Sequence, residues 1–439
     1  MRLTIESMAY GFDAVSHDEG GKAVFVAGGV PGDVVEARVT SDGKSFCKAV
    51  VEQVLEPSPD RVTPPCPYAG VCGGCPWATL AYPAQAAAKR KNVVDALARI
   101  GRMGSEAAEA LVAPIESPSE PWGYRNKVEL AVMPTERGIS LGMHARADGE
   151  PLVAVDRCLL LAKAHQKLPR SVSGALRYMG STRELGMERI GIRVSERTRQ
   201  VEVALWTDPE AFPRNEVAKV LTDAAKPTSV VRVLVKEGGA ARKVSRVERL
   251  SGRGSWEERI AGGKMTLSAP SFFQVNTAGA ERLVELVLEG LAPEQDECAV
   301  DLYCGAGTFT LPLARACEYV SAVESYGPAV RDLRRNLETA NLGNVDVIGG
   351  DAVREFPDAD ADVLVVDPPR AGLAPEAIEL IASTSARDVA YVSCNPATLA
   401  RDLRRFVKDG TFWPVSATPV DLFPQTFHCE TVVHLKREQ

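Results

Sequence analysis

The chain has no long apolar run: none approaches the roughly 18 consecutive residues that a membrane-spanning helix needs. Its first residues, Met1-Arg2-Leu3-Thr4-Ile5-Glu6, also lack the long apolar centre of a signal peptide. Positive charge is not in excess, because 51 Lys and Arg against 58 Asp and Glu give a net charge of −7. We therefore expect a cytoplasmic protein with no membrane partner, on which any nucleic-acid surface is a local patch of cations.

A secreted disulfide scaffold is excluded as well. Ten cysteines are few for a chain of 439 residues, and in a reducing compartment clustered cysteines more often bind metal or do chemistry. The length exceeds what one core spans and predicts two or three domains. With 45% hydrophobic and 25% charged residues, the composition is that of an ordinary globular protein, which we expect to be a monomer.

The first 57 residues read as short strands separated by glycine and proline turns. Candidate strands are 2–8, 22–26, 33–39 and 46–55, with turns at Gly20-Gly21, Gly28-Gly29 and Pro31-Gly32. Short strands with frequent turns predict a small β-barrel, of a kind that often binds oligonucleotides. The fold alone does not establish such binding.

A cysteine motif follows a proline-rich stretch at 57–67. Cys66, Cys72 and Cys75 have the spacing Cys-x5-Cys-x2-Cys, and Cys158 is the nearest later cysteine that could serve as a fourth ligand. Zinc sites favour paired Cys-x2–4-Cys units, whereas three close cysteines and one distant one are typical of an iron–sulfur centre. The spacing leaves both metals open and favours the cluster.

The central region, 58–268, reads as α+β. An alanine-rich pattern predicts a helix over 83–100, and strands are expected at 191–194 and 200–206. The stretch Trp122 to Lys127 mixes aromatic and basic groups, a mixture that can stack on bases and contact phosphate but that can equally form the edge of a strand.

Residues 269–439 alternate strand and helix as doubly wound α/β domains do. A strand over 299–303 leads into Cys304-Gly305-Ala306-Gly307-Thr308, and the next strand ends at Glu324. Glycines after the first strand let a ligand approach the backbone, and an acidic residue after the second can hold ribose hydroxyls. The Gly-x-Gly is too short for a pyrophosphate cradle, which favours S-adenosylmethionine over NAD. Asp351 and Asp367 end later strands and are expected to line the same site.

Cys394 stands where a predicted strand, 388–392, meets a helix-compatible run, 397–408. The carboxyl end of a parallel strand is where α/β proteins bind ligands. A cysteine there is a candidate nucleophile, since a thiolate is intrinsically very reactive. The alternative is a small buried hydrophobe, because free cysteine is among the most buried residue types.

Taken together, the motifs resemble the RNA uridine C5-methyltransferase family over essentially the whole chain. The matching pieces are a TRAM-like barrel, the four cysteines, Ser271-Phe272-Phe273-Gln274-Val275-Asn276, the segment Asp301 to Thr310, Asp367-Pro368-Pro369-Arg370, Ser393-Cys394-Asn395-Pro396 and Gln425-Thr426-Phe427-His428-Cys429-Glu430. The resemblance implies a Rossmann-like methyltransferase domain at 269–439. It also implies an RNA-binding barrel at 1–57 and a central α+β domain at 58–268 that carries an iron–sulfur cluster.

The resemblance also implies the roles of individual residues. It gives a [4Fe-4S] cluster on Cys66, Cys72, Cys75 and Cys158, and S-adenosylmethionine contacts from Gln274, Tyr303, Thr308, Glu324, Asp351 and Asp367. Cys394 becomes the nucleophile and Glu430 the base. Members of the family often have Phe at 303 and Asn at 308, so Tyr303 should still stack and Thr308 offers a hydroxyl where an amide would lie.

This chemistry predicts methylation of C5 of a uridine that is single-stranded or flipped out of a helix. Large-subunit (23S) ribosomal RNA is favoured as the substrate, and transfer RNA stays open. His428 is a rival for the role of base. Two other functions compete: an N-methyltransferase, which needs no cysteine nucleophile, and a non-catalytic RNA-binding protein with a vestigial cofactor site.

Overall fold

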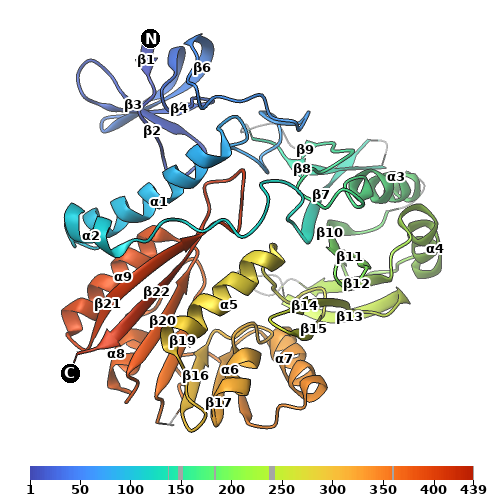
Figure 1. The fold of residues 1–439 in the computed structure, drawn as a ribbon. Coiled ribbons are helices and arrows are strands. Elements are labelled where there is room, and N and C mark those ends of the chain that lie inside the picture. The colour runs from blue at the N-terminus through green and yellow to red at the C-terminus, as the bar shows by residue number, and fades with distance from the viewer. Residues whose placement is uncertain (137, 147–151, 182–183, 237–242, 358–359, 439) are drawn as a thin grey trace.

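The computed structural model describes residues 1–136, 138–146, 152–181, 184–236, 243–357 and 360–438, which form three larger β-sheets and one separate hairpin (Figure 1). The barrel stands at one end of the molecule. The two other sheets, with their helices, make up the rest.

The N-terminal sheet closes on itself. Its strands are β1 (Arg2–Thr4), β2 (Ser7–Met8), β3 (Ala14–His17), β4 (Ala23–Ala27), β5 (Val34–Asp42) and β6 (Phe46–Glu56). β1 and β2 lie in one extended segment, which pairs with β5 at its start and with β3 at its end. Alternating side chains such as Val24 and Val26 fill the interior. This is the small-barrel architecture that we predict for residues 1–57, whereas its assignment as a TRAM-like RNA-binding module stays a prediction.

The central sheet is mostly antiparallel, with strand order β13-β12-β11-β10-β7-β8-β9. Its strands are β7 (Lys127–Thr135), β8 (Gly138–His144), β9 (Leu152–Val153), β10 (Met187–Ser195), β11 (Gln200–Thr207), β12 (Ser229–Lys236) and β13 (Lys243–Gly252). Helices α3 (Leu168–Gly180) and α4 (Arg214–Ala225) share a core with it, in which Leu176 and Leu221 pack with Ile190.

The C-terminal sheet has the order β18-β17-β16-β19-β20-β22-β21. Its strands are β16 (Cys298–Leu302), β17 (Tyr319–Glu324), β18 (Val345–Gly349), β19 (Val363–Val366), β20 (Asp388–Ser393), β21 (Phe412–Val420) and β22 (Glu430–Arg437). The first five strands in that order are parallel, and β22 is antiparallel to both of its neighbours. The parallel strands confirm the doubly wound pattern read from the sequence.

Helices cover both faces of this sheet. They are α5 (Thr277–Leu291), α6 (Thr310–Ala316), α7 (Gly327–Ala340), α8 (Pro375–Ser383) and α9 (Pro396–Asp409). Because side chains alternate along a strand, Val363 and Val365 of β19 pack in the core with α5, while Leu364 and Val366 pack in the core with α8 and α9.

Two segments from before residue 268 also pack on the C-terminal sheet. Helix α1 (Tyr82–Arg99), followed by α2 (Ser105–Leu111), places Val93 and Leu97 in the core that contains Leu302. The hairpin of β14 (Trp256–Ile260) and β15 (Gly263–Leu267) packs with Cys304 and Leu333. The boundary expected at 268 therefore does not separate these cores.

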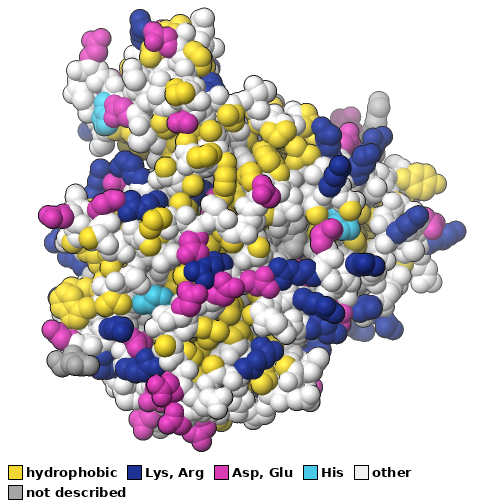
Figure 2. Space-filling model, in the orientation of Figure 1, with side chains coloured by type: hydrophobic (Ala, Val, Ile, Leu, Met, Phe, Trp, Pro, Cys, Tyr) yellow, Lys and Arg dark blue, Asp and Glu magenta, His cyan; other side chains and the backbone are white. Residues whose placement is uncertain are grey.

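Positive charge is concentrated locally. Figure 2 shows Lys and Arg side chains gathered over the part of the molecule formed by the central sheet and its helices. Exposed cations on α3 and α4 include Arg170, Arg177, Arg214 and Lys219. In the described part of the chain, no helix is long and apolar enough to cross a membrane.

Candidate active site

The carboxyl ends of the parallel strands lie in one row. Leu302 of β16 faces Val323 of β17 on one side and Val366 of β19 on the other, and Val366 faces Tyr391 of β20. The chain leaves β16 for β17 and β18, then returns to β19 on the opposite side of β16. The strand order therefore reverses between β16 and β19, which is the position where open α/β sheets bind ligands.

The loop after β16 is tightly turned. Tyr303 has φ +64°, an uncommon value for a residue with a side chain. The Gly305 N–H donates to Oε2 of Glu324 at 3.0 Å, so the glycine loop and the acidic end of β17 are joined. Gly307 has φ +102°, and a Cβ there would lie 2.3 Å from Cδ1 of Leu311. A side chain at 307 would be strained by this φ and would also have to displace the ends of the Leu311 and Leu333 side chains.

The other residues expected at the cofactor lie in different surroundings. Oδ1 of Asp351, after β18, accepts from the N–H of Val353 at 3.0 Å. Gln274 is buried, and its Oε1 has no hydrogen-bond partner within the described residues. Thr308 lines a cavity of only about 10 Å³ beside the β14–β15 hairpin, together with Gly307. The contact of Thr308 with a cofactor therefore stays a prediction.

Cys394 occupies the turn between β20 and α9. Asn395 caps α9, because its Oδ1 accepts from the N–H of Ala397 at 3.0 Å and of Thr398 at 3.5 Å. The Cys394 side chain is half-buried, and its carbonyl accepts from the Tyr10 hydroxyl at 2.8 Å. The structure does not place Cys394 in the core as a fully buried thiol. Fully buried cysteines such as Cys304 and Cys317 show that environment instead.

Glu430 lies beside Cys394 because of strand pairing. β22 runs antiparallel to β20 with Ser393 facing Thr431, so the first residue of β22 stands next to the residue that follows β20. Glu430 is 3% exposed, and its Oε2 has no hydrogen-bond partner among the described atoms. Burial, reinforced by the charge of Asp367, raises the pKa of the Glu430 carboxyl well above its ordinary value.

The thiol and the carboxylates influence one another. Burial, with the charges of Glu430 and Asp367, raises the pKa of the Cys394 thiol to about 12, while Arg370 lowers it. Burial and the charge of Glu324 raise the pKa of Asp367 to about 7. The residues that the sequence assigned to nucleophile, base and cofactor loop thus form one electrostatic group.

His428 and Arg370 lie at the rim of this group. Nη2 of Arg370 is 3.4 Å from Nε2 of His428. Burial and the nearby charge of Arg370 lower the pKa of His428 to about 4, so its imidazole is neutral at pH 7. Glu430 occupies the register position that faces Cys394, whereas His428 lies two residues before it.

The loop that leads into Glu430 is held from outside its own domain. Lys89 of α1 donates to Oδ1 of Asp421 at 2.6 Å and to the carbonyl of Phe423 at 3.0 Å. Gln85, one turn earlier, donates to Oε1 of Gln425 at 3.0 Å and accepts from its N–H at 2.9 Å. Sequence reasoning missed these contacts, because nothing in the local pattern of α1 connects it to a loop more than 300 positions later.

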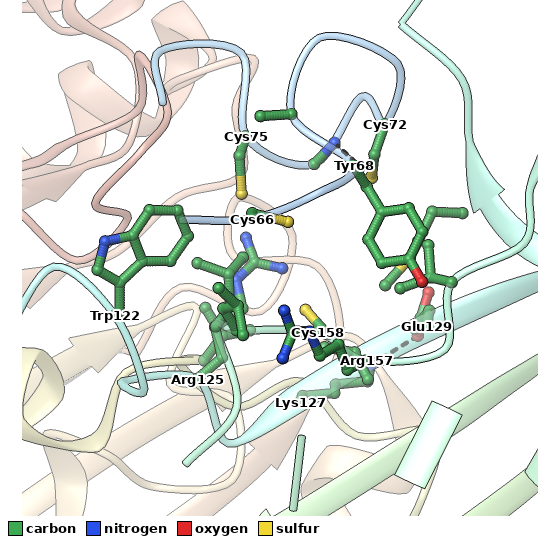
Figure 3. Close-up of a pocket in the computed structure, with 18 residues that line it drawn as sticks. Cys66, Tyr68, Cys72, Cys75, Trp122, Arg125, Lys127, Glu129, Arg157 and Cys158 are labelled. Atoms are coloured by element: carbon green, nitrogen blue, oxygen red, sulfur yellow. Dashed lines mark hydrogen bonds and ion pairs between the residues drawn. The ribbon is translucent and has the colours of Figure 1, made fainter. Parts of the chain in front are cut away.

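The four cysteines of the expected metal site surround one cavity of about 340 Å³ (Figure 3). The sulfur atoms of Cys75 and Cys158 point into it from opposite sides. Burial raises the pKa of both thiols, and the Arg125 guanidinium counteracts this effect. Within the described residues, no three His, Cys, Asp or Glu side chains converge as ligands of one metal ion do.

The aromatic and basic stretch at 122–127 faces this cavity. Trp122, Arg125 and Lys127 line it, and Nζ of Lys127 is 2.7 Å from Oε1 of Glu129. These side chains therefore share the cavity with the four cysteines, and their contact with RNA stays a prediction.

The fold and site define a Rossmann-like methyltransferase, and comparisons with known proteins agree. The family model described as tRNA (uracil-5-)-methyltransferase matches residues 259–438. An uncharacterised RNA methyltransferase of Gloeobacter violaceus is 36% identical over 99% of this chain and 96% of its own length. One of Thermosynechococcus vestitus is 34% identical, covering 99% of this chain and 97% of its own.

A solved structure extends the similarity to the whole fold. Pyrococcus abyssi tRNA (uracil-54, C5)-methyltransferase, in complex with S-adenosyl-L-homocysteine, matches with a TM-score of 0.76 and 25% identity, covering 99% of this chain and 100% of that one. The chain belongs to the RNA uridine C5-methyltransferase family. It is an RNA methyltransferase.

Proposed function

We propose that this enzyme transfers a methyl group from S-adenosylmethionine to C5 of a uridine in RNA, through a covalent intermediate on Cys394. The observation that carries the proposal is the position of Glu430. Strand register sets this buried carboxyl, one oxygen of which has no hydrogen-bond partner among the described residues, beside the half-buried thiol at the end of β20.

The chemistry explains why a thiol and a carboxylate are needed together. C5 of uracil is a weak nucleophile, and addition of the Cys394 thiolate at C6 makes C5 electron-rich. S-adenosylmethionine supplies an electrophilic methyl group to that carbon. Glu430 then accepts the C5 proton, and the thiolate leaves C6 as the C5–C6 double bond re-forms. Burial raises the pKa of the Glu430 carboxyl, so its carboxylate form is a stronger base than an exposed glutamate.

Residues around the glycine loop are suited to the methyl donor. Glu324 ends β17 and Asp351 follows β18, and both carboxylates can bind hydroxyls, while Tyr303 offers a ring for stacking. The buried Oε1 of Gln274 lacks a partner in the described part of the chain and can accept a hydrogen bond from a ligand. Asp367 and Thr308 complete the proposed set.

We also propose that Cys66, Cys72, Cys75 and Cys158 hold a [4Fe-4S] cluster. Four thiols around a cavity of about 340 Å³ fit a group larger than one ion, and zinc is the alternative. The Arg125 guanidinium offsets negative charge on the thiolates. Such a cluster would join the cysteine loop to the central sheet. Protein purified without oxygen should be brown and contain sulfide-labile iron, whereas a colourless protein with one zinc would reverse the assignment.

The substrate RNA has two candidates. The barrel and the cluster favour 23S ribosomal RNA, and the similarity to a tRNA (uracil-54, C5)-methyltransferase favours transfer RNA. Mapping 5-methyluridine in both RNAs from cells with and without the gene distinguishes them. Loss of the modification from neither RNA would argue against both.

Two variants test the mechanism. Cys394→Ala should abolish methyl transfer while S-adenosylmethionine still binds in a calorimetric titration, and Cys317→Ala, which removes a buried thiol in the sheet core, should stay active. Glu430→Gln should accumulate an enzyme–RNA adduct on a denaturing gel, and the exposed control Glu318→Gln should not. Methylation by Cys394→Ala near the wild-type rate would favour an N-methyltransferase, and failure of the wild type to bind the cofactor would favour a non-catalytic role.

A further inference from the structure

A loop of the N-terminal barrel reaches the active site. Residues 9–13 connect β2 to β3, and Tyr10 in this loop donates its hydroxyl hydrogen to the carbonyl of Cys394 at 2.8 Å. The two residues are 384 positions apart in the chain. Burial and the charges of Cys429, Cys394 and Glu430 raise the pKa of Tyr10, so the hydroxyl keeps its proton and remains a donor.

The bond holds a part of the cysteine turn that the helix cap does not contact. Asn395 orients the start of α9 through its side chain, as described above. The Cys394 carbonyl lies before the first helical residue and takes no part in that cap. The Tyr10 ring is itself held edge-on by Phe427 at 5.2 Å and by His428 at 6.2 Å between ring centroids.

A buried tryptophan links the barrel loop to the catalytic loop. Nε1–H of Trp77 donates to the carbonyl of Gly11 at 3.0 Å, and its backbone N–H donates to the carbonyl of Gln425 at 3.0 Å. Trp77 is 1% exposed and follows Cys75 by two residues. The segments that carry Tyr10, the cysteine cluster and Glu430 therefore meet at one residue, Trp77, through its side chain and its backbone N–H.

We propose that Tyr10 is a positioning residue for methyl transfer, whose hydroxyl holds the Cys394 backbone so that the thiol is aimed at C6 of the bound uridine. The barrel then belongs to the catalytic centre in addition to any RNA contact that it makes. This role rests on the proposed function of Cys394 as nucleophile.

The test compares two variants that each remove one hydroxyl from the barrel. Tyr10→Phe keeps the ring contacts and deletes the bond to Cys394. Ser16→Ala deletes a bond of the same type, from Oγ to the carbonyl of Thr4 at 2.7 Å, inside the barrel. Tyr10→Phe should lower kcat by about 3- to 10-fold, the range that one neutral hydrogen bond supports. The KM values for RNA and for S-adenosylmethionine should stay within about twofold. Ser16→Ala should leave kcat and both KM values unchanged.

A second readout isolates the step at which Tyr10 acts. In the Glu430→Gln background, Tyr10→Phe should slow formation of the covalent RNA adduct by the same factor as kcat. A raised KM for RNA with an unchanged kcat would overturn the proposal and make Tyr10 an RNA contact, and no change in either constant would also overturn it. Activity of Cys394→Ala would instead refute the proposed function itself. If Tyr10→Phe does not fold, Trp77→Phe is the second variant, because it loses the bond that holds the Gly11 carbonyl beside Tyr10. It should show the same loss of kcat, and an unchanged kcat would count against the proposal.

Discussion

Replacing Lys89 by methionine should destabilise the protein strongly. Nζ of Lys89 lies 2.6 Å from Oδ1 of Asp421, and both side chains are 0% exposed. Methionine preserves most of the apolar stem but leaves the carboxylate buried without its cation. Oδ2 of Asp421 already has no hydrogen-bond partner in the described part of the structure. Breaking a buried pair from one side costs about 3–5 kcal/mol, and we expect the free energy of unfolding to fall by that amount.

The measurement is guanidinium unfolding at pH 7, followed by the fluorescence of buried tryptophans. Lys91→Met is the matched control, because Lys91 lies on the same helix in an exposed ion pair with Asp95 at 2.8 Å. Such a pair is worth at most about 1 kcal/mol. Adding Asp421→Asn to Lys89→Met removes the orphaned charge and should recover about half of the loss. A Lys89→Met variant within about 1 kcal/mol of wild type would refute the reasoning.

The rate at which iodoacetamide alkylates Cys394 should keep rising with pH into the alkaline range, because the thiolate is the reactive form and the thiol has a pKa of about 12. Mass spectrometry of the peptide that contains Cys394 measures this rate. Glu430→Gln should shift this curve to lower pH, and an unshifted curve would mean that the carboxylate does not influence the thiol. Gly307→Ala should lower the free energy of unfolding by about 2–4 kcal/mol, because residue 307 has a positive φ and the new Cβ contacts Leu311. The control Gly343→Ala has open space around the new Cβ and should melt like wild type. Equal melting temperatures of the two variants would contradict the prediction. Cys158→Ala should lower the iron content of anaerobically purified protein while Cys298→Ala should not, and equal iron in both would exclude Cys158 as a ligand.

The parallel core of the methyltransferase sheet could be predicted well from the sequence. Strands such as Val363–Val366 are short apolar runs, each followed by a turn that begins with a carboxylate or a glycine. Segments with helical periodicity separate these runs along the chain. The residues expected after their carboxyl ends, Glu324, Asp367 and Cys394, follow directly from that pattern. The helix after Cys394 was also predictable, because residues 397–408 have helical periodicity and α9 covers Pro396–Asp409.

The antiparallel edge was harder to predict. β22 is antiparallel to β20, and that pairing alone brings Glu430 to Cys394. Local pattern carries no information on which strands pair, so the role of Glu430 came from family resemblance. Ala14–His17 was missed as a strand because it has only four residues and little β-branching. Tyr10 was missed because its partner is a backbone carbonyl in another domain.

The segment between α2 and Trp122 has a consequence for how this enzyme can be dissected. The Ala113 N–H donates to the carbonyl of Ala417 at 2.8 Å, and the Glu116 N–H to that of Pro419 at 2.9 Å, so the segment runs alongside β21 and shields the outermost strand. A fragment that begins at 269 would carry Cys394, Glu430 and the proposed cofactor residues, yet it would expose that strand and the apolar surface on which α1 packs. Unshielded strands recruit other chains, so such a fragment should precipitate, and a fragment of this domain that stays in solution needs residues from about 82 onward.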